Sequence, residues 1–129
     1  MNTALSEKWV FYPWSPNQGL DYLIHPEDLP MLQSHGLGIS FCLDDKGDYL
    51  KLKFKSVIVR VKKEGVKKIL PAPKFYWNQQ VRIKTSPSLS VEIHDLFWHH
   101  KDGDYYYYLL KEGKLDKKRY KESELDTIN

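Results

Sequence analysis

The sequence has little cysteine and no long apolar run, and both shortages limit where the protein can work. Cys42 is the only cysteine, so no disulfide can form within the chain. Its neighbours in the stretch 38–43 are mostly apolar, which predicts a small buried side chain rather than a reactive thiol. Residues 1–20 hold no apolar stretch as long as a signal peptide or a membrane span. We therefore expect a cytoplasmic protein that does not enter a membrane.

A large excess of charge is also missing. The chain has 20 Lys and Arg against 17 Asp and Glu, which leaves a formal charge of +3. Dedicated nucleic-acid-binding domains are usually more basic. The charge alone therefore identifies no class of partner. The basic cluster at 117–121 has acidic residues beside it, and we expect an ordinary surface of mixed sign there.

Motifs that carry catalysis or bind metals are absent too. The chain has no glycine-rich phosphate loop, nucleophile elbow or cysteine–histidine pair at a recognised spacing. His99 and His100 are adjacent, but on a strand they point to opposite faces, and His94 lies several residues away. We expect that the protein is not an enzyme and binds neither a metal ion nor a cofactor.

Aromatic and strand-forming residues are plentiful. The chain has 9 Tyr, 5 Phe and 4 Trp, and 41% of its residues are hydrophobic, so it can bury a core. A length of 129 residues fits one domain or two very small ones. Period-two alternation and turn signals predict strands near 39–43, 50–54, 57–62, 80–84, 90–99, 104–111 and 115–120. A helix is expected over 26–36, between Pro26 and Gly36, and Pro30 is expected to keep it short or irregular.

The strand pattern also predicts the core and the domain boundary. Lysines alternate with apolar residues over 50–55, so one face of this strand is expected to be wet and the other buried. The prolines of segment 70–73 cannot continue a sheet, which divides the chain into domains 1–72 and 73–129. The predicted core residues are Leu52, Phe54, Val59, Val81, Ile83, Val91, Ile93 and Leu109.

Four consecutive tyrosines are the most unusual feature. Alternation sends Tyr105 and Tyr107 to one face of a strand and Tyr106 and Tyr108 to the other. Only one pair can lie wholly in a core. The outward pair, with Trp98 or His100 from the preceding strand, would form an exposed aromatic surface. The alternative is that this pair packs against residues 1–72.

A resemblance supports a small barrel in the C-terminal part. The residues that carry it are Val81, Ile83, Ile93, the stretch 98–101, the stretch 105–110, Gly113, Lys114, Arg119, Tyr120, Glu124 and Leu125. By their spacing, residues 75–125 resemble the SH3-like or tudor-like barrels of bacterial proteins without an assigned function. The opening, with Trp14, Gly19, Leu20, Tyr22, His25 and Pro26, is similar to uncharacterised bacterial proteins of this size.

The resemblance implies a fold and, through it, binding rather than chemistry. We expect a mainly β protein, with an SH3-like barrel in the C-terminal part packed on an N-terminal β meander with one short helix. The expected function is a non-catalytic module that binds another protein or a peptide, in the manner of a bacterial immunity or defence protein. The alternative is a nucleic-acid-binding small β barrel. The predicted binding surface consists of Trp98, His100, Tyr106, Tyr108, Arg119 and Tyr120.

Overall fold

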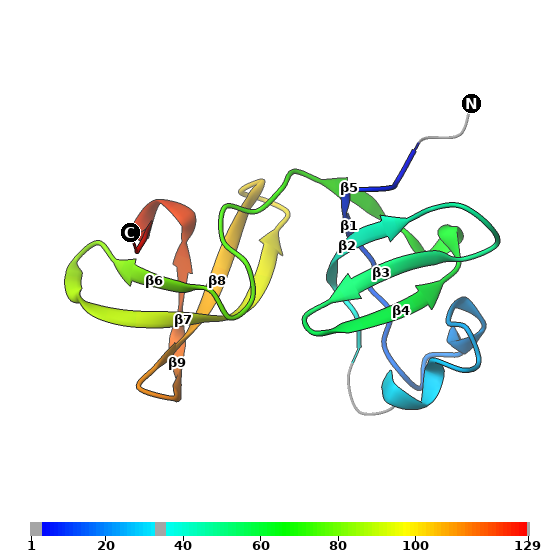
Figure 1. Ribbon diagram of the computed structural model, residues 1–129, viewed down its shortest axis with the longest axis horizontal. Coiled ribbons are helices and arrows are strands. Elements are labelled where there is room, and N and C mark those ends of the chain that lie inside the picture. Colours follow the sequence, from blue (N-terminus) through cyan, green and yellow to red (C-terminus); the bar gives the residue numbers. More distant parts are fainter. Residues whose placement is uncertain (1–3, 33–35, 129) are drawn as a thin grey trace. The chain divides into compact units, whose positions relative to one another are not determined.

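The computed structural model describes residues 4–32 and 36–128, and the chain divides into two compact units, Met1–Ala72 and Pro73–Asn129. Each unit is built on one five-stranded antiparallel sheet (Figure 1). In the described residues the helical segments are 3-10 turns of three or four residues. The mainly β fold predicted from the sequence is therefore confirmed.

The N-terminal unit is a meander whose last strand returns to the first. Its strands are β1 (Trp9–Phe11), β2 (Ile39–Asp44), β3 (Leu50–Phe54), β4 (Val57–Val61) and β5 (Lys68–Leu70), and its 3-10 turns are η1 (Asp21–Leu23), η2 (Leu29–Leu32) and η3 (Lys63–Gly65). The strand order across the sheet is β4-β3-β2-β1-β5. β1 therefore pairs with both β2 and β5.

The helix expected over 26–36 is only a short 3-10 turn. Its described part is η2, and residues 33–35 lie outside the described residues. Pro30 stands inside this turn, and its ring nitrogen has no hydrogen to donate to a preceding carbonyl. An α-helix cannot propagate through such a residue without losing a hydrogen bond, which explains the short turn.

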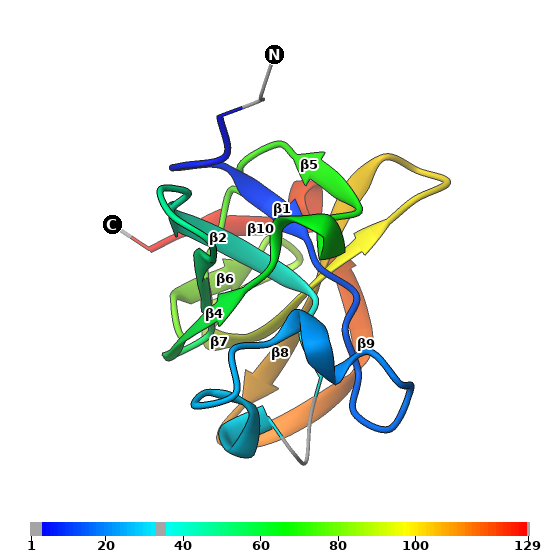
Figure 2. The same cartoon turned by 90° about the vertical axis from the view of Figure 1, so that its right-hand side faces the viewer.

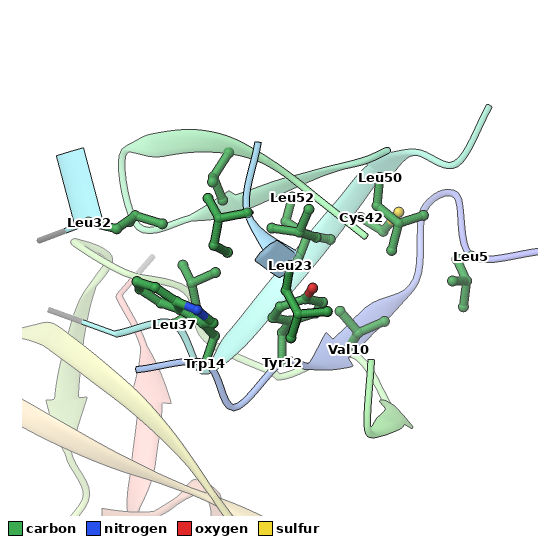
Figure 3. Close-up of a cluster of buried hydrophobic side chains, with 13 residues drawn as sticks. Leu5, Val10, Tyr12, Trp14, Leu23, Leu32, Leu37, Cys42, Leu50 and Leu52 are labelled. Carbon is green, nitrogen blue, oxygen red and sulfur yellow. The ribbon is translucent and has the colours of Figure 1, made fainter. Parts of the chain in front are cut away.

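The core of this unit lies between the sheet and the long connection from β1 to β2. Leu50 and Leu52 are buried while Lys51 and Lys53 are exposed, as the alternation predicts. Figure 3 shows the cluster of apolar side chains. Its members include Val10, Tyr12, Trp14, Leu23, Ile24, Leu32, Leu37, Cys42, Val59 and Val61. The prediction that Cys42 is a small buried side chain is thus confirmed, and burial raises the pKa of its thiol.

Phe54 is a correction to the predicted core, because it is only partly buried. It ends β3, and the next residue, Lys55, has a positive φ of 55° in the turn to β4. The Lys55 ammonium lies 5.5 Å from the centre of the Phe54 ring. A ring at this place therefore covers the end of the core and keeps one side toward solvent.

The outer edge of β4 is covered by an ion pair that the sequence did not single out. The Asp28 carboxylate accepts hydrogen bonds from the Arg60 N–H at 2.8 Å, from its Nε at 2.9 Å and from its Nη2 at 2.8 Å. The Arg60 carbonyl accepts the N–H of His25 at 2.9 Å. These bonds satisfy backbone groups that would otherwise be an open sheet edge.

Asp28→Asn is expected to lower the free energy of unfolding by about 1–2 kcal/mol at neutral pH, because the amide lacks the charge that Arg60 binds. The hydrogen bond from Arg60 lowers the pKa of Asp28 below its usual range. The stabilisation is therefore complete above the unfolded-state pKa and is lost as the pH falls below about 4. Urea unfolding at pH 7 and pH 3 measures this, and the gap between wild type and variant should shrink at pH 3.

Glu27→Gln is the matched control, because Glu27 lies 3.8 Å from the same guanidinium but its side chain is 77% exposed. It is expected to change stability little at either pH. An equal loss of unfolding free energy in both variants would contradict this prediction, because it would show that any negative charge near Arg60 stabilises the unit as well as the hydrogen bonds of Asp28 do.

The C-terminal unit has longer strands. They are β6 (Gln80–Ile83), β7 (Ser86–His99), β8 (Asp104–Lys111), β9 (Lys114–Lys121) and β10 (Leu125–Thr127), with the 3-10 turn η4 (Glu122–Glu124) before the last strand. The order is β10-β6-β7-β8-β9, so β9 is an edge strand. Figure 2 shows β9 as an orange strand. The core residues predicted here, Val81, Ile83, Val91, Ile93 and Leu109, are buried as expected.

A β-bulge in β7 decides which of its later side chains face the core. Ile93 is opposite Leu109 and Asp95 is opposite Tyr108, so His94 is an extra residue without a counterpart on β8. Before the bulge the odd-numbered Val91 and Ile93 are buried, and after it the even-numbered Leu96 and Trp98 are buried. The extra residue thus inverts the alternation along one strand.

Candidate functional site

The tyrosine run places Tyr105 and Tyr107 in the core, as predicted. They are 2% and 0% exposed, and burial raises the pKa of both. The Tyr107 ring meets Phe75 edge-on at 5.5 Å, and its hydroxyl donates to the Glu122 carboxylate. This pair of tyrosines therefore serves the structure of the unit.

Trp98 and Tyr120 do not lie on the predicted surface. Trp98 is 6% exposed and meets the Tyr105 ring edge-on at 5.0 Å, because the bulge at His94 turns it inward. Tyr120 is 4% exposed and pairs with Tyr107 across β8 and β9, so it shares the inner face. The expectation that these two rings point outward is wrong.

The outer face of β7, β8 and β9 instead carries a cluster that we call the ring face, made of Phe97, His99, Tyr106 and Arg119. The His99 and Tyr106 rings stack at 5.1 Å with 17° between their planes. The Arg119 guanidinium lies 4.9 Å from the centre of the Tyr106 ring and 6.0 Å from that of Phe97. Because β8 lies between β7 and β9, His99 and Arg119 approach Tyr106 from two neighbouring strands.

Tyr106 is fixed in this cluster by its hydroxyl, although the sequence predicts it to be exposed. The hydroxyl donates to the Asp102 carboxylate, which raises the pKa of Tyr106 and lowers that of Asp102. The Asp102 N–H donates in turn to Nδ1 of His99 at 3.2 Å. Tyr106 is 8% exposed because these neighbours cover it. Its ring therefore supports other side chains and offers little surface of its own.

The exposed members of the ring face are Phe97 and Arg119. Phe97 is 41% exposed, and Arg119 is exposed on the edge strand. Sequence reasoning missed Phe97 and His99, because strict alternation after Ile93 places Phe97 inside. The apolar Leu96 and Trp98 at even positions are the signal that could have shown a change of register.

The two remaining predicted residues lie near this cluster without completing it. Tyr108 is half-buried and pairs with Asp95 on one side and Arg119 on the other. His100 is exposed in the turn after β7. Of the six predicted residues, Tyr106 and Arg119 are in direct contact, and Tyr108 is next to Arg119 in register.

The N-terminal unit has a hollow of about 400 Å³ that also collects aromatic side chains. Tyr12, Trp14 and Tyr22 line it, together with Glu64 and Lys67. The Tyr12 hydroxyl donates to the Lys62 carbonyl, and the Trp14 indole donates to the Leu20 carbonyl. Tyr12 and Trp14 are thus held in the core, and the opposite charges of Glu64 and Lys67 favour no ligand of one sign.

The described residues contain no group of three or more His, Cys, Asp or Glu side chains that could hold a metal ion. Over residues 4–32 and 36–128, none of the helices is long and apolar enough to cross a membrane.

Comparison with known proteins places the chain in a family without assigning it an activity. No curated protein and no solved structure matches the chain. One family model covers residues 1–126, nearly the whole sequence. The chain therefore belongs to a family of unknown function, DUF6960.

Proposed function

We propose that this is a non-catalytic, cytoplasmic binding protein that contacts another protein through the ring face of its C-terminal unit. The observation that carries the proposal is the position of Arg119, whose guanidinium lies over Tyr106 and beside the exposed Phe97. Arginine and aromatic side chains held in one rigid arrangement are the residues that dominate protein interfaces. The stack also holds the Arg119 side chain in one conformation before a partner binds, which reduces the entropy lost on binding.

The contrast with Arg60 supports this reading. The Arg60 guanidinium is bound by Asp28, whereas the Arg119 guanidinium makes no hydrogen bond or ion pair within the part of the chain that the structure describes. Its N–H donors are therefore available to a partner. A guanidinium stacked on rings gives up less conformational freedom when it binds than a free side chain would.

The proposal includes an SH3-like barrel for the C-terminal unit. Its support is the strand order, in which β6 pairs with both the second and the last strand of the unit. A short 3-10 turn precedes that last strand. A strand connected in this way brings the two ends of the unit together, as closure of a small barrel requires.

A nucleic-acid-binding barrel is the second candidate. The observation that favours it is the same stack, because an exposed phenylalanine and a planar guanidinium can also stack on unpaired bases. The low net charge favours the protein partner.

Display of a random peptide library on phage tests the two candidates with the full chain as bait. Peptides are expected to be enriched on the wild type and lost on the double variant Phe97→Ser, Arg119→Ser, which removes the exposed part of the ring face. Thermal unfolding must show that this variant is folded. Enrichment that survives in the variant would refute the ring face as the contact. Salt-sensitive retention of single-stranded RNA by the wild type alone would favour the second candidate.

A further inference from the structure

The acidic side chains around β9 are occupied by contacts within the unit. Asp116 accepts the Lys118 N–H at 3.1 Å, the Tyr120 hydroxyl at 2.8 Å and the Lys111 ammonium at 3.0 Å. These contacts, the Lys118 N–H first, lower the pKa of Asp116 to about 2. Asp116 is therefore charged at neutral pH, and that charge is already balanced by Lys111.

The acids of η4 are occupied in the same way. Glu122 accepts the Tyr107 hydroxyl and the Lys74 N–H at 3.0 Å. Glu124 accepts the Lys121 N–H at 3.0 Å and lies 3.7 Å from the Lys118 ammonium. Glu124 thus pairs with Lys118, Glu122 is held by neutral donors, and neither makes an ion pair with another cation of β9.

Four cations of β9 have no such partner. Lys114, Lys117, Arg119 and Lys121 are exposed, and none makes an ion pair with the residues that the structure describes. The sequence predicts a mixed-sign surface at 117–121, because Asp116, Glu122 and Glu124 flank this basic cluster. In the structure Asp116 pairs with Lys111 and Glu124 pairs with Lys118, which leaves these four cations against the single charge of Glu122, so the charge that β9 offers to a partner is positive.

We infer that the edge strand β9, together with the ring face, binds an acidic segment of a partner protein, in which one carboxylate meets Arg119 and others meet the lysines. This inference rests on the proposed function and names the chemistry of its partner. A guanidinium has paired N–H donors that match the two oxygens of a carboxylate. Lysines along the same strand are spaced for further acidic side chains.

The flanking acids favour a protein partner over a nucleic acid. Asp102 lies against the ring face through Tyr106, and Asp95 is in register with Tyr108 beside Arg119. A nucleic acid carries a negative phosphate on every nucleotide, so its backbone would pass close to these carboxylates and be repelled by them. An acidic protein segment can place its few carboxylates at β9 and present neutral side chains to Asp95 and Asp102.

Titration of the full chain with two synthetic peptides, followed by NMR, tests the inference. The probe is a twelve-residue peptide of alternating glutamate and threonine, and the control is the same peptide with glutamine for glutamate. The acidic peptide is expected to shift amide signals of β9 and of Phe97, with an affinity that falls as salt rises. No shift at millimolar peptide, or equal shifts with the glutamine peptide, would overturn the inference. Tighter binding of oligouridylate at the same residues would also overturn it.

Two arginines of the same unit provide the matched variants. Arg119→Ala is expected to weaken binding of the acidic peptide about tenfold, as loss of an interface arginine commonly does. Arg82→Ala removes an exposed arginine of β6 and should leave the affinity within about twofold. Arg119→Lys should fall between them, because it keeps the charge and loses the planar stack. Equal affinities of Arg119→Ala and wild type would overturn the assignment of Arg119.

The outcome is separable from that of the proposed function. Displayed peptides that bind through Phe97 and Arg119 but contain no acidic residues would support the proposed function and refute this inference. Loss of both kinds of binding would refute both.

Discussion

Replacing Tyr105 and Tyr107 together by alanine is expected to leave the C-terminal unit unfolded. Both rings are buried, and they pack against Trp98 and Phe75. Truncation of a buried aromatic side chain costs roughly 3–5 kcal/mol, and small domains are stable by only about 5–15 kcal/mol. Loss of the dispersed NMR signals of residues 80–127 would confirm the expectation.

The matched control replaces the other two tyrosines of the same run, Tyr106 and Tyr108. Tyr106 is covered by the surface side chains of His99, Asp102 and Arg119 rather than by the core, and Tyr108 is half-buried, so the double alanine variant is expected to lose less stability and remain folded while the ring face loses its support. Arg119 would then be mobile, and binding through the ring face should weaken. If both double variants were equally unfolded, the assignment of inner and outer tyrosines would be refuted.

The strands were predictable where a strong alternation is bounded by turn residues. The prediction for 50–54 coincides with β3, and the prediction for 104–111 coincides with β8. Both strands are followed by turns at positive φ, at Lys55 and at Glu112–Gly113. Local sequence determines such hairpins, because the turn fixes which residues are opposite each other.

The strand β5 was not predictable from local pattern. Lys68–Leu70 is short, and the prolines that follow it indicate a linker. Its partner β1 lies nearly sixty residues earlier, at Trp9–Phe11. A three-residue strand becomes recognisable only through that distant pairing, which no local window contains.

The common plan of the two units was equally hidden. In each, the first strand pairs with the second and the last, and a 3-10 turn precedes the last strand. The sequence shows no internal repeat, because different side chains satisfy the same pairing. One such difference is the contact between Tyr12 and Gly65 in the N-terminal unit. The Tyr12 ring lies so close to Gly65 that a Cβ atom added to this glycine would be 2.3 Å from the ring. This contact requires glycine at position 65, and it joins residues too far apart in the sequence for a local pattern to reveal it.

Two of the six residues predicted for the binding surface, Trp98 and Tyr120, are buried, and the charge of the surface near 117–121 also differs from the prediction. Trp98 is inside because His94 adds one residue to β7. Lys114, Lys117, Arg119 and Lys121 make no ion pair with the described residues, because Asp116 pairs with Lys111 and Glu124 pairs with Lys118. Counts of charged residues cannot show which of them are paired, and that pairing determines the chemistry of the partner.

Insertion of one alanine between Asp95 and Leu96 is expected to abolish the native packing of β7, because each later side chain would then face the other side of the sheet. Leu96 and Trp98, now 7% and 6% exposed, would turn outward, and Phe97 would turn into the core. Loss of cooperative unfolding, followed by tryptophan fluorescence in urea, would show this. Deletion of His94 is the matched control, because it removes only the residue without a counterpart on β8 and leaves Asp95 opposite Tyr108, so this variant is expected to unfold cooperatively. An insertion variant that unfolds like the wild type would show that the strand can shift its register freely, and the ring face would then have no fixed position.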